Sequence, residues 1–271
     1  MAINLGAFWQ CYAILLVKGN TTKGGVYLIM EGEALRERLQ NLVQERGASL
    51  FGVADLSTVK DYIADIYGED LLHLDRAVVL GMPYPRGVVN QLEAGPTHTY
   101  LHYYKVLNTR LDDLALRIAN ILQDEGYEAF PIPASQRVTE DKLAGIFSHR
   151  LAGSLAGLGW IGRNCSLINP QYGPRLRLVT VLTEAQLPTD QPLDNKCGQC
   201  RACVEACPAA ALTGEEFKGE DPLEKRFAAK QCDEYLSKVR VTFGKRICGR
   251  CLAVCPWGKK STRRNENVGV K

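Results

Sequence analysis

Apolar residues follow two different periods between residues 30 and 185. Helical spacing predicts three helices, one from Met30 that ends before Gly47, one between Tyr100 and Gln123, and one from Asp141 to Leu155. Short apolar runs bounded by turn residues predict strands at Ser49–Ala54, Ala77–Met82, Tyr127–Pro133 and Arg175–Thr183. Helices that alternate with strands are typical of an α/β (α+β) domain.

The pattern also divides the chain into four parts. Residues 1–29 have no comparable periodicity, so we expect a leader or a start assigned too far upstream. Residues 30–186 form the predicted α/β domain. Prolines, acids and amides from Leu187 to Lys196 mark a boundary. Residues 187–260 then hold most of the cysteines, and residues 261–271 form a basic tail.

Composition excludes a transmembrane protein. The 271 residues are 46% hydrophobic, and no apolar run approaches the roughly 18 residues that a membrane-spanning helix needs. The first apolar stretch has no basic residue before it, so the protein is predicted to be cytoplasmic. The net charge of +3 conceals a basic end, because from Lys238 onward the only acid is Glu266. This end either contacts nucleic acid or is simply a solvated tail.

Eight of the ten cysteines lie between Cys197 and Cys255, and in a reducing compartment such a group indicates metal ligation. The first run is Cys197, Cys200, Cys203 and Cys207 followed by proline, which is the spacing of a bacterial ferredoxin. The second run is Cys248, Cys251 and Cys255, again followed by proline. Its leading cysteine is missing, and Cys232 can supply that ligand.

In two-cluster ferredoxins the fourth cysteine of each run binds the other cluster. This rule predicts two [4Fe-4S] clusters, the first held by Cys197, Cys200, Cys203 and Cys255, and the second by Cys207, Cys232, Cys248 and Cys251. The alternative is a four-cysteine zinc site made from the pairs 197/200 and 248/251. Zinc would leave the remaining cysteines and both prolines without a role.

A glycine-rich segment precedes the cysteines and contains Gly157, Gly159, Trp160, Gly162 and Arg163. Glycine lets the backbone approach a flat or bulky group closely. The segment follows a predicted helix and not a strand, which argues against dinucleotide binding. Taken alone it is a tight helix exit packed by the tryptophan.

The order of these motifs resembles the epoxyqueuosine reductase family, cobalamin- and iron-sulfur-dependent enzymes of tRNA queuosine synthesis. The resemblance covers about residues 30–260 and is most specific at Gly-Trp-Ile-Gly, residues 159–162, and at the cysteines. It extends more distantly to the reductive dehalogenases.

The resemblance implies a nitroreductase-like cobalamin-binding domain followed by a ferredoxin-like two-[4Fe-4S] domain. Cobalamin is then expected near Gly157, Gly159, Trp160, Gly162 and Arg163. It also implies an electron donor protein of the ferredoxin or flavodoxin type, and tRNA as a candidate partner. The Asp-x-His-x-x-Gly motif of histidine-ligating cobalamin modules is absent from the sequence.

The substrate half departs from the family pattern. Leu143 stands where family members carry an aspartate thought to donate a proton, with Asp141 nearby. His149 and Arg150 replace the glutamate and lysine of the same stretch, and His102-Tyr103-Tyr104-Lys105 replaces Asp-Tyr-His-Lys. These departures argue against epoxyqueuosine as the substrate.

No catalytic residue is assigned from the sequence. His149 could act as an acid, although a helical histidine is more often structural. Tyr103 or Tyr104 could donate a proton or pack as buried rings, and Cys165 could meet a cofactor or serve as a small apolar residue. Two functions remain, a cobalamin-dependent reductase of an unidentified substrate and a ferredoxin-type electron-transfer module without catalysis of its own.

Overall fold

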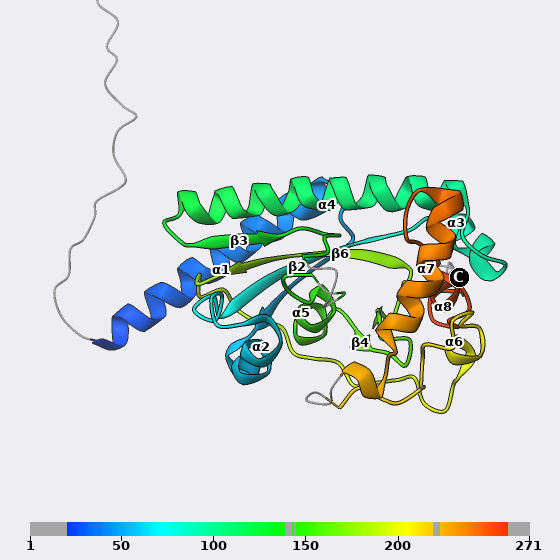
Figure 1. Ribbon diagram of the computed structural model, residues 1–271. Helices are drawn as coiled ribbons and strands as arrows, with labels where there is room; N and C mark the ends of the chain where they lie inside the picture. The colour runs from blue at the N-terminus through cyan, green and yellow to red at the C-terminus, as the bar shows by residue number, and fades with distance from the viewer. Residues whose placement is uncertain (1–20, 139–142, 144, 219–222, 260–271) are drawn as a thin grey trace, which may run out of the picture.

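The centre of the molecule is a four-stranded antiparallel sheet with the strand order β1-β2-β6-β3 (Figure 1). The computed structural model describes residues 21–138, 143, 145–218 and 223–259, with side chains from Met30 onward. The strands of the sheet are β1 (Leu50–Asp55), β2 (Arg76–Pro83), β3 (Ala129–Ile132) and β6 (Leu176–Thr183). The four predicted strands are confirmed, and their antiparallel pairing makes the domain α+β.

Helices cover both faces of this sheet (Figure 1). One face carries α1 (Thr21–Glu45) and α4 (His98–Asp124), and the other carries α2 (Lys60–Tyr67) and α5 (His149–Leu155). Successive side chains of a strand point to opposite faces. Val78 and Leu80 of β2 accordingly pack with α1 and α4, whereas Ala77 and Val79 pack with α2 and α5.

Two predicted helix starts were wrong. Helix α1 begins at Thr21, ahead of Met30. The helix predicted from Asp141 begins only at His149, because Ser148 caps it by accepting a hydrogen bond from the Leu151 amide at 3.2 Å. Leu143, which precedes this cap, takes the left-handed conformation with φ of 49°, which a helix does not allow. Asp141 itself lies outside the described residues.

The cysteine-rich part packs against one end of the sheet domain (Figure 1). Its helices are α6 (Ala202–Glu205), α7 (Ala229–Phe243) and α8 (Arg250–Ala253), with the 3-10 turn η3 (Leu223–Lys225). Helix α8 contacts α3 (Arg86–Asn90) and the 3-10 turn η2 (Gln91–Glu93) of the sheet domain. A small hairpin of β4 (Trp160–Ile161) and β5 (Leu167–Ile168) lies between the two parts. The predicted boundary at residues 187–196 carries no helix or strand.

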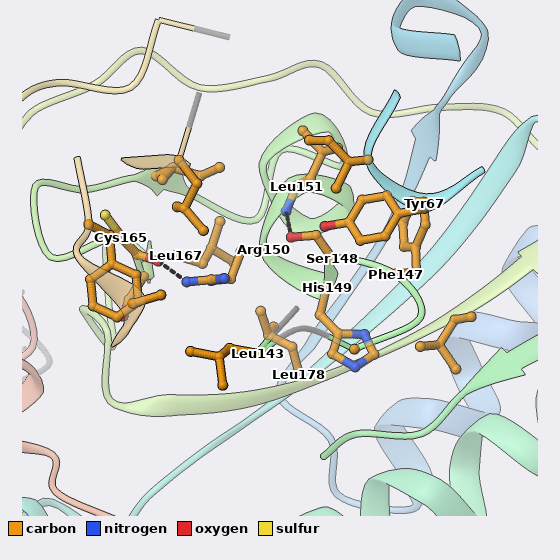
Figure 2. A pocket seen from close by; sticks show the side chains of 18 of the residues that line it. Tyr67, Leu143, Phe147, Ser148, His149, Arg150, Leu151, Cys165, Leu167 and Leu178 are labelled. Carbon is orange, nitrogen blue, oxygen red and sulfur yellow. Dashed lines mark hydrogen bonds between the residues drawn. The ribbon is translucent and has the colours of Figure 1, made fainter. Parts of the chain in front are cut away.

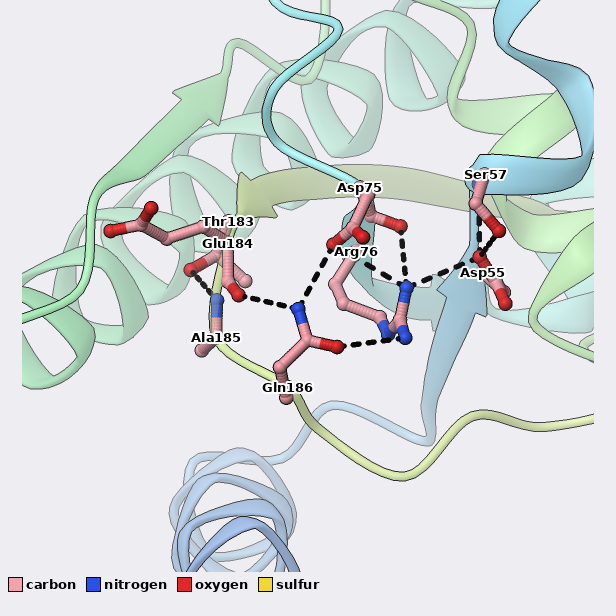
Figure 3. Close-up of polar contacts among 8 residues, drawn as sticks. All are labelled: Asp55, Ser57, Asp75, Arg76, Thr183, Glu184, Ala185 and Gln186. Atoms are coloured by element: carbon pink, nitrogen blue, oxygen red, sulfur yellow. Dashed lines mark hydrogen bonds and ion pairs between the residues drawn. The ribbon is translucent and has the colours of Figure 1, made fainter. Parts of the chain in front are cut away.

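A polar network fixes the opposite end of the sheet (Figure 3). Arg76 at the start of β2 donates to Asp55 at 3.2 Å and to Gln186 at 3.1 Å. Gln186 in turn donates to Asp75 and to the Glu184 carbonyl. The 3-10 turn η1 (Ser57–Val59) begins with hydrogen bonds from Ser57 to Asp55. The network joins the ends of β1, β2 and β6, so the other end is free to carry the cysteines.

Candidate redox site

Cys197, Cys200, Cys203 and Cys255 surround one small pocket. Burial, followed by the negative charge of Cys197 and Cys200, raises the pKa of the Cys203 thiol to about 11. Burial is also the first cause that raises the pKa of Cys255 to about 12, and the three other cysteines add to it. The first run and the last cysteine therefore meet in space, which is the arrangement that the crossover rule assigns to the first cluster. Ligation itself stays a prediction.

Cys207, Cys232, Cys248 and Cys251 form a second group beside the first. Burial, reinforced by Cys207 and Cys248, raises the pKa of Cys232 to about 11. Burial and the charge of Cys248 likewise raise the pKa of Cys251. Helix α7 brings Cys232 to this group from a part of the sequence that lies outside both runs.

The donor set fits iron-sulfur clusters. Buried thiols that crowd together ionise only when a cation balances their charge, and soft sulfur ligands suit iron-sulfur or zinc. A zinc site needs its ligands close enough to bind one ion. Within the ranges that the structure describes, no three His, Cys, Asp or Glu side chains are arranged to hold one metal ion. The eight grouped cysteines favour two clusters, in which each thiolate binds a different iron, over a four-cysteine zinc site that would leave four cysteines without a metal.

The glycine segment lies beside the first group of cysteines. Its glycines are in close contact with other parts of the chain. A Cβ at Gly159 would come within 2.2 Å of the Ile168 carbonyl oxygen, and one at Gly157 within 2.5 Å of that of Gln191. A Cβ at Gly162 would meet the Ile168 side chain at 2.6 Å. These glycines are thus required by close contacts of the backbone with the chain itself.

Trp160 and Arg163 also make contacts with protein. Trp160 is buried and meets Trp257 edge to face with ring centroids 5.0 Å apart. Arg163 donates to the Gly198 carbonyl at 2.8 Å and to Glu216 at 2.7 Å, and also to the Gly214 carbonyl. Arg163 lines the four-cysteine pocket, but none of the five predicted cofactor-binding residues lines the large cavity described next. The contacts favour a structural role, and cofactor binding by these five stays a prediction.

A cavity of about 870 Å³ lies between the sheet domain and the cysteines (Figure 2). Its walls come from α2, α5, β6 and the segment around η3. Cys165 and Leu252 form the wall on the side of the cysteines. Cys165 is buried and packs in one apolar cluster with Cys203, Cys207 and Cys251. Cys165 therefore lies between the cavity and the cysteines with which it packs.

His149 lines this cavity with both ring nitrogens engaged. Nδ1 lies 2.9 Å from Thr180 Oγ1, and Nε2 lies 3.0 Å from the Pro133 carbonyl oxygen. Because a carbonyl only accepts, Nε2 carries the proton and Nδ1 accepts from the threonine hydroxyl. Burial lowers the pKa of His149 to about 4, so the ring is neutral near pH 7. These contacts favour the structural interpretation over a proton donor.

Three of the positions that depart from the family pattern, Leu143, His149 and Arg150, line the cavity. Leu143 lines it, whereas Asp141 lies outside the described residues. Tyr104 is hydrogen-bonded to Ser135, which lines the cavity, and the Arg177 guanidinium stacks on its ring at 4.6 Å. Burial is the largest influence on the pKa of Tyr104 and by itself would raise it, but the charge of Arg177, the hydrogen bond to Ser135 and the smaller contributions of Lys245 and Asn108 together lower the pKa. Tyr103 is exposed and makes an edge contact with His102.

Three arginines of this region were missed by the sequence reasoning: Arg175, Arg177 and Arg226. Arg175 is buried and donates to the Ala253 carbonyl of α8 at 2.8 Å and to Asn90 at 2.6 Å. Arg177 and Arg226 line the cavity. The one available signal was that Arg175 and Arg177 interrupt an otherwise apolar strand.

Comparison with known proteins agrees with this geometry. Residues 196–258 match the family model of a 4Fe-4S double cluster binding domain. The fold and the cysteines therefore define a double-cluster iron-sulfur protein built on an α+β domain.

Relatives found by sequence narrow the class of protein further. The chain is 31% identical to the epoxyqueuosine reductase of Pseudomonas aeruginosa over 205 residues, which are 68% of this chain and 51% of that protein. It is 31% identical to the enzyme of Bacillus anthracis over 167 residues, 58% of this chain and 39% of that protein. The chain is a relative of the epoxyqueuosine reductases, as its motif order indicated. It spans about half the length, or less, of these two relatives.

Solved structures share the fold. The epoxyqueuosine reductase of Streptococcus thermophilus superimposes with a TM-score of 0.54 at 21% identity, over 83% of this chain and 66% of that one. A reductive dehalogenase, described with a mechanism for B12-dependent dehalogenation, superimposes with a TM-score of 0.66 at 22% identity, over 87% of this chain and 33% of that one. The predicted fold class, an α/β (α+β) domain followed by a two-cluster domain, is confirmed.

Proposed function

We propose that this protein is a cobalamin-dependent reductase in which two [4Fe-4S] clusters pass electrons to cobalamin in the large cavity and from there to an unidentified substrate. One observation carries the proposal: the cavity of about 870 Å³ has a wall in common with the two cysteine groups, through Cys165 and Leu252. An electron carrier needs clusters near its surface, but it does not need a large cavity beside them. The cavity therefore favours the reductase over the electron-transfer module.

The cluster ligands follow from the two groups. We assign the first cluster to Cys197, Cys200, Cys203 and Cys255, and the second to Cys207, Cys232, Cys248 and Cys251. The grouping of each set in space supports this assignment. Eight ionised thiols call for a reducing compartment, so we place the protein in the cytoplasm. Among the described helices, none is sufficiently long and apolar to cross a membrane.

The cavity suits cobalamin bound without a protein histidine on cobalt. His149 is the one histidine among the described residues that line it, and both of its nitrogens are engaged in hydrogen bonds. The volume lies in the upper part of the range of small-molecule sites, and the cavity opens to solvent, so a larger ligand can extend outward. Bound cobalamin would supply a cobalt ion that accepts electrons and transfers them to the substrate.

The chain also offers a proton source for the reduction. Tyr104 is connected to the cavity through Ser135, and Arg177 stabilises its ionised form. A tyrosine with a lowered pKa gives up its proton more readily, which suits a general acid. Tyr104 is therefore our candidate for the role of the family aspartate that Leu143 replaces.

The substrate and the partners are less defined. One solved epoxyqueuosine reductase contains a tRNA-Tyr stem loop that carries epoxyqueuosine. The basic end of this chain is compatible with RNA, but the altered cavity residues argue against the same substrate. We propose a ferredoxin- or flavodoxin-type protein as the electron donor.

Cobalt retention tests the proposal. Protein reconstituted anaerobically with iron, sulfide and cobalamin should retain one cobalt per chain after gel filtration. An equal molar amount of a histidine-ligated cobalamin protein serves as the positive control. Iron retention without cobalt would contradict the reductase and support the electron-transfer module.

A further inference from the structure

Three arginines from separate segments line the large cavity. Arg150 lies in the first turn of α5, Arg177 lies in β6, and Arg226 follows η3. Within the part of the chain that the structure describes, none of the three is paired with a carboxylate. The described lining thus contains three guanidinium groups that are not in an ion pair.

The three guanidinium groups retain free hydrogen-bond donors. Arg150 donates one hydrogen bond, to the Cys165 carbonyl (Figure 2). Arg177 donates to Asn108 at 2.7 Å through Nε and to the Ala134 carbonyl at 2.9 Å through Nη2, which leaves Nη1 available. A guanidinium has five donors and no acceptor. Each arginine can thus still bind an acceptor.

Arg226 is the most constrained of the three. Its residue surface is only 4% exposed, and its Nε donor is buried without a hydrogen-bond partner. Its guanidinium lies over the Phe217 ring at 4.6 Å. Burying a guanidinium without an anion or a full set of acceptors is unfavourable, so an anion in the cavity would stabilise this side chain.

Among the residues that the structure describes, the other titratable groups around the cavity are not paired with these arginines. Asp65 and Glu224 line it, but both side chains are exposed. His149 is neutral near pH 7. Cys165 is a thiol whose pKa is raised by burial. An anion that enters the cavity thus meets positive charge that has no carboxylate partner among the described residues.

We propose that Arg150, Arg177 and Arg226 bind an oxyanion, a carboxylate or a phosphate, of the substrate. The planar fork of arginine matches both groups, and the field of three guanidinium groups favours an anionic substrate over a neutral one. The inference rests on the proposed function in one respect, which is that the cavity is the place of reaction. It narrows the substrate class to small anionic organic molecules or phosphate-bearing ones.

Binding of inorganic phosphate tests this site. Isothermal titration at low ionic strength is carried out on protein that holds its clusters and cobalamin. Arg226→Gln and Arg150→Gln should each weaken phosphate binding about tenfold or more, because each removes a charge-assisted contact. Arg226→Lys retains the charge and should recover part of the affinity. Arg117→Gln on the exposed side of α4, where Arg117 pairs with Asp113, is the matched control.

Two results would overturn the inference. Equal phosphate affinity in the wild type and all cavity variants is the first. Unchanged phosphate affinity in Arg226→Gln together with an altered cluster reduction potential is the second, because the arginine would then only offset cluster charge. Arg150→Gln keeps the test decisive if Arg226→Gln does not fold, since Arg150 is exposed.

A parallel titration without cobalamin separates this inference from the proposed function. Arginine-dependent phosphate binding in a protein that never retains cobalt would support the anion site and contradict the cobalamin proposal. Phosphate binding that disappears when cobalamin is added would assign the site to the phosphate group of the cofactor. That result would overturn the assignment to the substrate.

Discussion

At the scale of single residues, His149 shows how the fold uses a side chain that sequence reasoning considered as an acid. The ring joins Thr180 of β6 to the Pro133 carbonyl. Burial holds its pKa at about 4, whereas an unfolded histidine titrates near 6.5. The residue is better explained as a brace of the cavity wall.

This shift makes stability depend on pH. Between about pH 6.5 and 4 the unfolded chain binds a proton that the folded chain does not, so the free energy of unfolding falls as the pH falls. The contribution of His149 is fully present above pH 6.5, and its loss by pH 4 is on the order of 3 kcal/mol. Anaerobic urea unfolding at pH 5 and pH 7.5 measures the effect. His149→Asn should reduce the difference between the two pH values, and an unchanged difference would contradict this role.

Replacing Cys232 tests the assignment of a single cluster ligand. Cys232→Ala should lose the second cluster and retain the first, because Cys207, Cys248 and Cys251 alone leave one iron without a thiolate. Iron content should fall by about half. Cys165→Ala, which removes a buried cysteine that is not assigned as a ligand, is the control and should keep its iron. Full iron retention in Cys232→Ala would show that another residue completes the cluster.

At the scale of elements, the sequence predicted those helices and strands that bury apolar residues in a regular pattern, and the cysteines that follow a fixed spacing. Strands β1, β2 and β6 and helix α4 were predictable because each buries a run or a stripe of apolar residues. Helix α7 was not predicted, since it has no buried residue and therefore no stripe. The eight cysteines were predictable from their spacing, whereas the arginine site was not, because Arg150, Arg177 and Arg226 come from segments far apart in sequence.

Gly249, between Cys248 and Cys251, is a position where the start of α8 requires glycine. It precedes α8 with φ of 84°, and a Cβ there would lie 2.6 Å from Leu92 Cδ1. Gly249→Ala should combine left-handed strain of about 1 kcal/mol with overpacking of about 1–3 kcal/mol. Gly244→Ala is the matched control, because its φ is 66° and nothing lies within 4 Å. Thermal unfolding should rank Gly249→Ala as the less stable; equal values would contradict the close contact.

At the scale of the whole molecule, function depends on how the sheet domain and the cysteine-rich part are joined. Arg175, immediately before β6, joins the sheet domain to α8, and Arg163 joins the glycine segment to the loop of the first cysteine run. The cavity lies at this junction. A change at the junction should therefore affect the clusters and the cavity together.

Arg163→Ala tests the junction and the predicted cofactor role at once. It removes hydrogen bonds to the Gly198 and Gly214 carbonyls and to Glu216, which should destabilise the folded protein by about 2 kcal/mol. The first cluster should then bleach faster in air, with cobalamin affinity unchanged. Arg117→Ala serves as the surface control. Loss of cobalamin binding with normal cluster lifetime would instead favour Arg163 as a cofactor ligand.

The central claim is that eight cysteines hold two cubane clusters beside the cavity. The most direct measurement is the iron, sulfide and zinc content of protein purified without air, together with its absorbance spectrum. We predict a brown protein with about eight irons and eight sulfides per chain. A colourless protein, or one that contains zinc in place of iron, would contradict the account.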